Sequence, residues 1–307
     1  MNVDRNSSVL VTGGRGFIGR TVAKLLRRKG YSVVSLDASP VSSAAAPVRE
    51  SVREVVGDIT DVAQLQRIFE IQPFGGIVHL AAILPTAAQL EPLRATQVNV
   101  DGGVNLLEMA RRFEVRRMVF GSSLSVYGTC AADRIVSEAG RAAPEDLYGA
   151  AKLYVERLGE VYRGRHGLEF VSLRIGRVVG PGAQSATSAW RSQIFELLGT
   201  THPTEILLPY IGSERILLAH VDDVSRMLVD LLGAPRLEHA IYNAPCESVV
   251  VANLKGAVEA LNANINIELG TAYAVVNPRL LDFSCFQREY GFAMAQIVEQ
   301  LRTAAGK

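Results

Sequence analysis

A tyrosine and a lysine four residues apart are the side chains of this sequence best suited to moving a proton. Tyr148 and Lys152 stand in the pattern Y-G-A-A-K, and residues with this spacing share one face of a helix. A lysine ammonium beside a phenol favours the phenolate, so we expect the pKa of Tyr148 to lie below its usual value of about 10. Ser123 ends a short apolar run and could bring a hydroxyl to the same sheet edge. The pattern is also common on ordinary amphipathic helices, but with Ser123 it makes Tyr148 a candidate general acid or base.

A glycine-rich segment near the N-terminus could bind phosphate groups. Residues 9–19 read VLVTGGRGFIG, in which Gly14, Gly16 and Gly19 follow the pattern G-x-G-x-x-G. Glycine permits a tight turn, a close approach of backbone N–H groups to a pyrophosphate, and close packing of helix on sheet. The helix N-terminus would then face the phosphate charge. A glycine-rich turn without a ligand is the alternative, but the strand–loop–helix context predicts a dinucleotide site that also includes Gly13, Phe17 and Ile18.

An acidic residue follows the glycine loop at the spacing expected for ribose recognition. Asp37 lies 18 residues after Gly19, at the end of the second expected strand. There a carboxylate can accept hydrogen bonds from the adenosine ribose and repel a 2′-phosphate, which favours NAD over NADP. Asp37 could instead be a turn residue, and Arg15 in the loop could in principle meet a 2′-phosphate. We predict NAD, and comparable catalytic efficiency with NADP would contradict this prediction.

Strand and helix patterns alternate through the first half of the chain. Short β-rich runs lie at residues 8–12, 31–36, 52–56, 76–80 and 117–120. Helix-compatible segments separate them, the first over residues 21–29. Strands separated by helices predict parallel pairing with right-handed crossovers. The expected fold class is α/β, a Rossmann-type doubly wound parallel sheet with a small C-terminal substrate-binding lobe.

The alternation is interrupted after the middle of the chain, which predicts two structural parts. We expect residues 1–176 and 215–244 to form the NAD-binding Rossmann domain. Residues 177–214 and 245–307 are expected to form the substrate-binding lobe. Glycine, serine and threonine are frequent where the first domain is interrupted, so the chain is expected to leave the sheet there.

Composition excludes several other classes of protein. The 307 residues are 48% hydrophobic, and 32 basic against 31 acidic residues leave a net charge of +1. This charge gives no reason to expect nucleic acid or an anionic membrane as the partner. Three widely separated cysteines form neither a disulfide framework nor a zinc pattern and favour a reducing compartment. No apolar run reaches the roughly 18 residues needed to span a bilayer. We expect a cytoplasmic protein that acts on a small-molecule substrate and holds no metal.

A set of short motifs identifies the sequence as similar to a known family. In order they are TGGRGFIG, GDITD, HLAA, NVDGGVNLLEMAR, SSLSVYG, YGAAK, LRIGRVVGPG and HVDDV. As a set they resemble the extended short-chain dehydrogenase/reductase superfamily, specifically the NAD-dependent epimerase/dehydratase family. The resemblance covers nearly the whole chain.

The resemblance implies roles for individual residues. Ser123 matches the catalytic serine or threonine that hydrogen-bonds the reacting oxygen, Tyr148 the proton-transfer tyrosine, and Lys152 the lysine at the nicotinamide ribose. Asp58 matches the adenine-contacting acid, and Asn99 lies in the helix that faces the cofactor. The neighbouring cofactor contacts that the resemblance implies are Ile59, Leu80, Ala81 and Ala82. Asp58 could instead be a turn residue, and Asn99 an internal hydrogen-bonding residue. Family members often form homodimers through two helices, here residues 92–113 and 147–163.

The family implies oxidation of a secondary alcohol, followed by one of three outcomes. Leu124 and Ser125 stand where 4,6-dehydratases carry an Asp-Glu pair, which disfavours dehydration. Arg177 stands where many nucleotide-sugar enzymes have an asparagine, and its planar fork could meet a carboxylate or phosphate, although it could also be a surface arginine. Arg215 loosely matches an arginine that contacts the substrate diphosphate.

Three functions remain open. The leading prediction is a nucleotide-sugar epimerase, with Arg177 and Arg215 as substrate-binding residues. Residues 79–92 also resemble the same stretch of short-chain L-threonine dehydrogenases. The alternative is therefore a simple NAD-dependent dehydrogenase of a small hydroxy acid, a sugar acid or an L-threonine-like substrate. A non-catalytic NAD-binding sensor is the third, although such a protein would not need Ser123, Tyr148 and Lys152 together.

Overall fold

A computed structural model describes residues 3, 7–39, 52–183 and 188–307 of the chain. Its largest element is a seven-stranded sheet in which every neighbouring pair is parallel. The strands are β1 (Ser8–Thr12), β2 (Ser32–Asp37), β3 (Val52–Val56), β4 (Phe74–His79), β5 (Arg117–Ser123), β7 (Glu169–Ile175) and β11 (Ile241–Asn243). The five runs expected from the sequence all form strands, with ends that shift by up to three residues.

The strand order confirms the expected fold class. It runs β11-β7-β5-β4-β1-β2-β3, so the chain winds outward in one direction from β1 and then in the other from β4. This is the doubly wound order of dinucleotide-binding sheets, and the crevice for ligands lies where the order reverses, beyond the carboxyl ends of β1 and β4. Most side chains of the central strands are buried because helices cover both faces.

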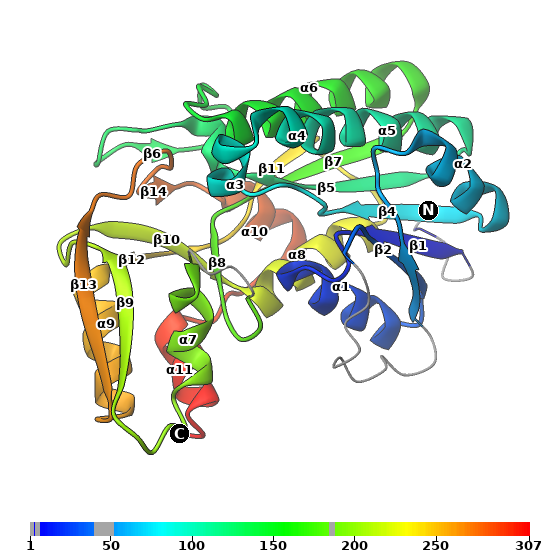
Figure 1. Cartoon of the computed structure of the whole chain (residues 1–307). Coiled ribbons are helices and arrows are strands. Elements are labelled where there is room, and N and C mark those ends of the chain that lie inside the picture. The colour runs from blue at the N-terminus through cyan, green and yellow to red at the C-terminus, as the bar shows by residue number, and fades with distance from the viewer. Residues whose placement is uncertain (1–2, 4–6, 40–51, 184–187) are drawn as a thin grey trace.

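Each face of the sheet has its own hydrophobic core (Figure 1). One face packs against α2 (Val62–Ile71), α5 (Gly102–Arg112) and α6 (Leu147–His166). The other packs against α1 (Phe17–Arg28), α8 (Val221–Gly233) and α10 (Ser284–Tyr290). The short segments that join these layers are α3 (Pro85–Leu90), α4 (Pro92–Thr96), a π-helical turn (Gln97–Asp101), a 3-10 turn (Leu124–Tyr127), β6 (Ile135–Val136) and β14 (Leu280–Leu281).

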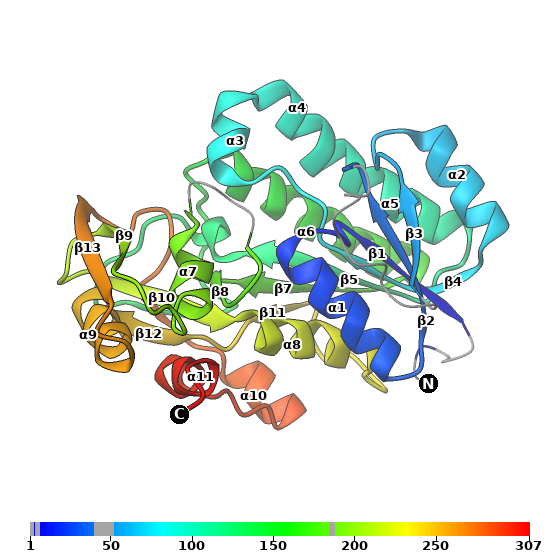
Figure 2. The same ribbon diagram turned by 60° about the horizontal axis from the view of Figure 1, so that its bottom comes forward.

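A second group of elements lies to one side of the large sheet (Figure 2). Its strands are β8 (Arg177–Val179), β9 (Thr204–Tyr210), β10 (Arg215–His220), β12 (Glu247–Val250) and β13 (Ile265–Ala272), and its helices α7 (Trp190–Glu196), α9 (Val251–Leu261) and α11 (Ile297–Ala304). They share a third hydrophobic core. Strand β10 pairs with β8 on one side and β12 on the other. The division into two domains at the expected boundaries remains a prediction.

The helices and cysteines of residues 3, 7–39, 52–183 and 188–307 bear on the expected class of protein. None of the helices there is long and apolar enough to cross a bilayer. All three cysteines have free thiols. No group of three or more potential metal ligands is found in the same part of the chain.

Candidate active site

A pocket of about 1000 Å³ opens at the carboxyl edge of the sheet, where the strand order reverses. It is lined by the glycine loop, the ends of β2, β4 and β5, the start of α6, and residues of β8, α7 and β9. The predicted site residues that line it are Gly13, Gly16, Phe17, Ile18, Gly19, Asp37, Asp58, Ile59, Leu80, Ala81, Ala82, Ser123, Tyr148, Lys152 and Arg177. Residues from distant parts of the sequence therefore share one cavity.

Three predicted residues do not line this pocket. Gly14 packs behind the loop, where an added Cβ would lie 2.2 Å from the Ser35 hydroxyl oxygen. Asn99 is buried and holds the backbone of Ile83 through two hydrogen bonds, of 2.7 and 2.9 Å. It therefore fits the alternative of an internal hydrogen-bonding residue. Arg215 donates to the Ser248 carbonyl oxygen at 3.3 Å, on the neighbouring strand β12, and is exposed. The pairing of β10 with β12 thus keeps its guanidinium out of the pocket.

The glycine loop has the geometry that a bound pyrophosphate requires. Gly13 has a φ of +66°, and an added Cβ would lie 2.7 Å from the backbone nitrogen of Ala81. At Gly19 it would lie 2.1 Å from the Gly13 carbonyl oxygen. Helix α1 begins at Phe17, four residues earlier than expected, because extended Gly16 leads directly into it. No side chain caps this helix, which leaves its first N–H groups for a ligand.

The charges at the end of β2 suit a ribose with free hydroxyl groups. The Asp37 carboxylate accepts hydrogen bonds from the backbone N–H groups of Arg15, at 3.1 Å, and Ser39, at 3.0 Å, which fix its orientation at the pocket wall. The guanidinium of Arg15 pairs with Glu54 at 3.0 Å. This arginine is engaged by an acid, whereas a carboxylate faces the pocket, so the residues present fit NAD.

Asp58 both lines the pocket and holds its own turn. One carboxylate oxygen accepts hydrogen bonds from the backbone and hydroxyl of Thr60, each at 2.8 Å, and the other pairs with Arg94 at 2.5 Å. Burial opposes ionisation, but the hydrogen bonds from Thr60 and Arg94 outweigh it and lower the pKa of Asp58. The residue that caps α2 is Asp61, which accepts from the Gln64 N–H at 2.9 Å. Asp58 therefore remains available as a charged residue of the pocket wall.

Ser123, Tyr148 and Lys152 meet at the end of β5. Ser123 is the last residue of β5, and its hydroxyl oxygen accepts from the Ser125 N–H at 3.1 Å. Tyr148 lies in the first turn of α6, whose start is fixed by Asp146 accepting from the Gly149 N–H at 2.6 Å. One turn further along α6, the Lys152 Nζ donates to the Gly121 carbonyl oxygen at 2.7 Å and lies 5.5 Å from the centre of the Tyr148 ring.

The pKa of Tyr148 differs from the value expected from the sequence. Burial raises the pKa of Tyr148 above its ordinary value, and the nearby Asp146 adds to the effect, while Arg191 and a hydrogen bond with Ser123 oppose it. Burial lowers the pKa of Lys152 to about 7, although Glu156 acts in the opposite direction. The expectation that Lys152 lowers the pKa of Tyr148 is therefore wrong for this structure. The physical reason is that burial penalises the charged form of each group, the phenolate of Tyr148 and the ammonium of Lys152.

A buried polar network lies beneath this site and was not predicted from the sequence. Glu156, fully buried on α6, pairs with Arg174 of β7 at 2.7 Å and accepts from the Ser122 hydroxyl at 2.5 Å. Arg174 also donates to the Tyr127 hydroxyl at 2.8 Å. The signal available in the sequence was an acid four residues after Lys152, on the same helix face. The network ties α6 to β5 and β7 directly below the reactive groups.

A pair of arginines lies at the other end of the pocket. The predicted Arg177 donates from Nε to the Tyr210 hydroxyl at 3.1 Å. Arg191, on α7, lines the same cavity and was not anticipated. No spacing in the sequence links Arg191 to the other site residues, because α7 reaches the pocket only through the packing of the third core.

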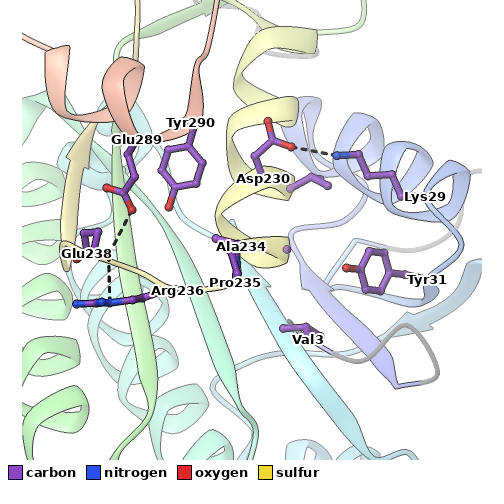
Figure 3. A pocket seen from close by; sticks show the side chains of 12 residues that line it. Val3, Lys29, Tyr31, Asp230, Ala234, Pro235, Arg236, Glu238, Glu289 and Tyr290 are labelled. Atoms are coloured by element: carbon purple, nitrogen blue, oxygen red, sulfur yellow. Dashed lines mark hydrogen bonds and ion pairs between the residues drawn. The ribbon is translucent and has the colours of Figure 1, made fainter. Parts of the chain in front are cut away.

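A second pocket, of about 820 Å³, contains none of the predicted site residues (Figure 3). Its charged side chains already have partners: Lys29 pairs with Asp230, and Arg236 with Glu238. Glu289 accepts hydrogen bonds from the Tyr242 hydroxyl and from the backbone of Glu238. The groups that could perform chemistry are thus concentrated in the first pocket.

A dinucleotide crevice that also holds a tyrosine, a lysine and a serine at the edge of a doubly wound sheet defines a short-chain dehydrogenase/reductase fold and site. Within that class, the chain belongs to the NAD dependent epimerase/dehydratase family, whose model matches residues 9–244. The family membership expected from the motifs is confirmed.

Individual relatives include both epimerases and dehydrogenases. The chain is 35% identical over 187 residues to UDP-glucuronate 4-epimerase 3 of Arabidopsis thaliana, which is 58% of this chain and 44% of that protein. It thus spans less than half the length of this relative. A UDP-glucose 4-epimerase from Thermus thermophilus, solved in complex with NAD, is 25% identical with a TM-score of 0.81, covering 97% of this chain and 98% of that one. An L-threonine dehydrogenase from Cupriavidus necator is 21% identical with a TM-score of 0.86, covering 98% and 99% of the two chains, and shows the shared fold.

Proposed function

We propose that this protein is an NAD-dependent enzyme that oxidises a secondary alcohol of a sugar or sugar derivative, and that it is a nucleotide-sugar epimerase. The observation that carries the proposal is the meeting of Ser123, Tyr148 and Lys152 in one pocket with the glycine loop. The similarity to a UDP-glucuronate 4-epimerase over 58% of the chain supports the choice of substrate class.

The residues of the pocket suit the binding of NAD along the sheet edge. The N–H groups of the glycine loop and of α1 would hold the pyrophosphate, and Asp37 the adenosine ribose. Asp58 and Ile59 would contact the adenine, while Leu80, Ala81 and Ala82 form the wall between the two ends. When bound, NAD accepts a hydride from a carbon that carries a hydroxyl group and can return it.

Each reactive side chain has a defined role in this mechanism. The phenolate of Tyr148 takes the proton of the substrate hydroxyl, and in the return step the neutral phenol gives it back. Ser123 hydrogen-bonds the reacting oxygen and orients it toward Tyr148. Lys152, when charged, favours the phenolate and binds the nicotinamide ribose. The raised pKa of Tyr148 favours the neutral phenol, which is the form needed to protonate a ketone.

The side chains after Ser123 favour epimerisation over dehydration. Leu124 and Ser125 form the 3-10 turn that follows β5, and neither carries a carboxyl group that could act as acid or base in an elimination. An epimerase needs no such group, because it presents the other face of the ketone for return of the hydride. This outcome produces an epimer without net formation of NADH.

A second candidate is a simple dehydrogenase. The fold matches that of an L-threonine dehydrogenase over nearly the full length of both chains. A dehydrogenase would use Ser123, Tyr148 and Lys152 in the same way but release the ketone. The two functions therefore differ in product release rather than in the oxidation step.

Product analysis distinguishes the candidate functions. The purified protein is incubated with NAD and, separately, with UDP-glucuronate, UDP-glucose and L-threonine, and products are followed by NMR and NADH absorbance. We expect a sugar epimer without net NADH. NADH formation with L-threonine would instead establish the dehydrogenase. When the incubations are extended to a broad panel of hydroxy acids, sugar acids and nucleotide sugars, binding of NAD without turnover would establish the sensor and overturn the proposal.

The quaternary structure and location belong to the same proposal. We propose a homodimer formed by residues 92–113 and 147–163, which carry the exposed apolar side chains of Leu93, Tyr154 and Val161. Three free cysteines support a cytoplasmic location. The nearly balanced net charge supports a small-molecule partner rather than nucleic acid or membrane. Residues 177–214 and 245–307 would supply the substrate-binding lobe.

A further inference from the structure

We propose that Arg177 and Arg191 form a clamp for a carboxylate group that the substrate carries close to its reacting hydroxyl. The proposal rests on the proposed function for the place of the reaction, at Tyr148. It adds the chemical class of the substrate: a hydroxy acid or uronic acid unit rather than a neutral sugar.

The two arginines are brought together by Tyr210. Arg177 donates from Nε to the Tyr210 hydroxyl at 3.1 Å, with its guanidinium carbon 5.4 Å from the ring centre. Arg191 lines the same pocket as Arg177 and Tyr210. The Tyr210 ring is held in turn by an edge contact with buried Trp190, with centres 6.2 Å apart. Strand β8, strand β9 and helix α7 thus aim two cations at one part of the pocket.

Neither cation has an acidic partner in the described part of the chain. No ion pair involves Arg177 or Arg191 there, and the Nε of Arg191 is buried without a hydrogen-bond partner. Burial lowers the pKa of Arg191, and the charge of Arg177 lowers it further. Two guanidinium groups that repel each other in a partly buried site are stabilised by an anion between them.

The carboxylates of the pocket are engaged elsewhere. Asp37 and Asp58 lie with the glycine loop and make the hydrogen bonds described above. Asp146 accepts from the Gly149 N–H at the start of α6. The anion that would satisfy the two arginines must therefore come from the ligand.

The position of the pair favours a carboxylate over a diphosphate. Arg177 and Arg191 line the same pocket as Tyr148, and the charge of Arg191 acts on the Tyr148 phenol, whose pKa it lowers. An anion held by the two arginines would therefore share the pocket with the reacting hydroxyl. In a nucleotide sugar the diphosphate is attached across the ring from the 4-hydroxyl. A carboxylate on a neighbouring carbon remains close to that hydroxyl, and its two oxygens match the guanidinium fork.

Probes that differ only in the acid group test the clamp. The pairs are UDP-glucuronate with UDP-glucose, and L-threonine with L-threoninol, each measured by calorimetry and turnover with NAD present. Variants Arg177→Asn and Arg191→Gln should lose about 100-fold in affinity and kcat/KM for the acid that binds, since each removes charged hydrogen bonds. Affinity and kcat/KM for the neutral probe of the same pair should change by less than about 3-fold. Arg191→Lys keeps the charge without the fork and should lose less than Arg191→Gln.

Several controls make the outcome decisive. Arg236→Gln removes an exposed arginine from a surface ion pair and should leave the affinity and turnover of both probes unchanged. Circular dichroism and thermal melting establish that each variant is folded, and Arg177→Asn carries the test if Arg191→Gln does not fold. UDP alone tests whether the arginines bind the diphosphate instead. If the arginine variants lose the same affinity for UDP, UDP-glucose and UDP-glucuronate, the arginines bind the diphosphate and the clamp is overturned.

Different results would overturn the carboxylate clamp and the enzymatic proposal. Two results would overturn the clamp and leave the redox function intact. One is turnover by the wild type without preference for the acid, and the other is an equal loss of affinity for the acid and the neutral probe in the arginine variants. Arginine-dependent binding of an acid without any turnover would support the clamp and overturn the enzymatic proposal. Binding of none of the probes would overturn the clamp.

Discussion

At the scale of single residues, the site combines groups whose charge is set by burial. Burial raises the pKa of Tyr148, which keeps its phenol neutral, and lowers the pKa of Lys152 to about 7, so that the lysine is only partly charged near neutral pH. Both depend on the same desolvation, which penalises the charged form of each. A ligand that displaces or orders water at this point would therefore change both groups together.

The removal of one hydroxyl group tests the role of Tyr148. Tyr148→Phe should lower kcat for UDP-glucuronate with NAD by about 1000-fold, because proton transfer by a positioned side chain contributes roughly that much. NAD affinity, measured by calorimetry, should stay within about 3-fold, since the phenol oxygen is not needed to hold the pyrophosphate. Turnover close to that of the wild type would remove Tyr148 from the mechanism.

The depressed pKa of Lys152 has a consequence for stability. Between pH 7 and the ordinary lysine pKa, the unfolded chain binds a proton at this residue that the folded protein has released. Stability should therefore rise with pH in this window, by at most about 1.4 kcal/mol per unit. Below pH 7 both states are protonated, and the full penalty of burying the charge is present.

Urea unfolding at several pH values measures this effect. The free energy of unfolding of the wild type, relative to Lys152→Met, should increase between pH 7 and 9. Lys24→Met, which changes an exposed lysine on α1, should show no such difference from the wild type. A pH-independent difference between the wild type and Lys152→Met would show that the buried lysine keeps an ordinary pKa.

At the scale of elements, the site depends on how closely α1 and α6 pack on the sheet. Gly19 allows α1 to lie against the loop, and Glu156 links α6 to β7 through Arg174. These contacts fix the starts of α1 and α6 at the pocket, where the proposed function requires a pyrophosphate and a substrate hydroxyl. Each contact can be removed separately.

The close approach of α1 makes Gly19 sensitive to a single methyl group. Gly19→Ala would place Cβ 2.1 Å from the Gly13 carbonyl oxygen, so the helix must shift. We expect an affinity for NAD at least about 10-fold weaker and a stability loss of about 1–3 kcal/mol. Gly164→Ala, in α6 with open space around the new Cβ, should instead stabilise by up to about 1 kcal/mol. Unchanged NAD affinity in Gly19→Ala would contradict the assignment of this loop.

The buried pair of α6 and β7 should contribute to stability as a unit. Glu156→Gln leaves the Arg174 charge buried without its partner and should cost about 3–5 kcal/mol in urea unfolding. Glu160→Gln, which disrupts a surface pair on the same helix, should cost no more than about 1 kcal/mol. Similar costs for the two variants would mean that the buried pair is well hydrated in solution.

At the scale of the whole molecule, the helical layer of α4 and α6 carries the surface of the proposed dimer. Leu93 of α4 and Tyr154 and Val161 of α6 are exposed apolar side chains, and both helices belong to the layer that covers one face of the sheet (Figure 1). Their exposure is consistent with the proposed dimer, because isolated chains rarely display several large apolar groups together. The pocket lies within one chain, so dimerisation would stabilise the site rather than complete it.

A charge placed on this surface tests the dimer. Tyr154→Glu should shift the protein from dimer to monomer in light scattering after gel filtration, because a buried unpaired carboxylate disfavours association. Leu207→Glu, at an exposed apolar residue of β9 outside this surface, should remain dimeric. A wild-type protein that is monomeric at micromolar concentration would refute the proposed interface.

Much of the dinucleotide crevice could be predicted because its signals are local. The turn after β1 needs glycine for backbone reasons, Tyr148 and Lys152 are one helical turn apart, and buried parallel strands are continuous apolar runs. Each of these features depends on neighbours within a few residues, so it can be predicted directly from the sequence. Even so, the start of α1 was expected four residues too late, because glycines weaken the helical pattern.

The substrate end of the pocket was decided by packing between distant segments. Arg191 reaches it because α7 packs in the third core, while Arg215 is carried away by the pairing of β10 with β12. The pKa values of Tyr148 and Lys152 likewise follow from burial, which no spacing of residues reports. Contacts between remote segments and the water they exclude are properties of the folded chain, and for this reason the position of Arg191 and of Arg215 could not be predicted from the sequence.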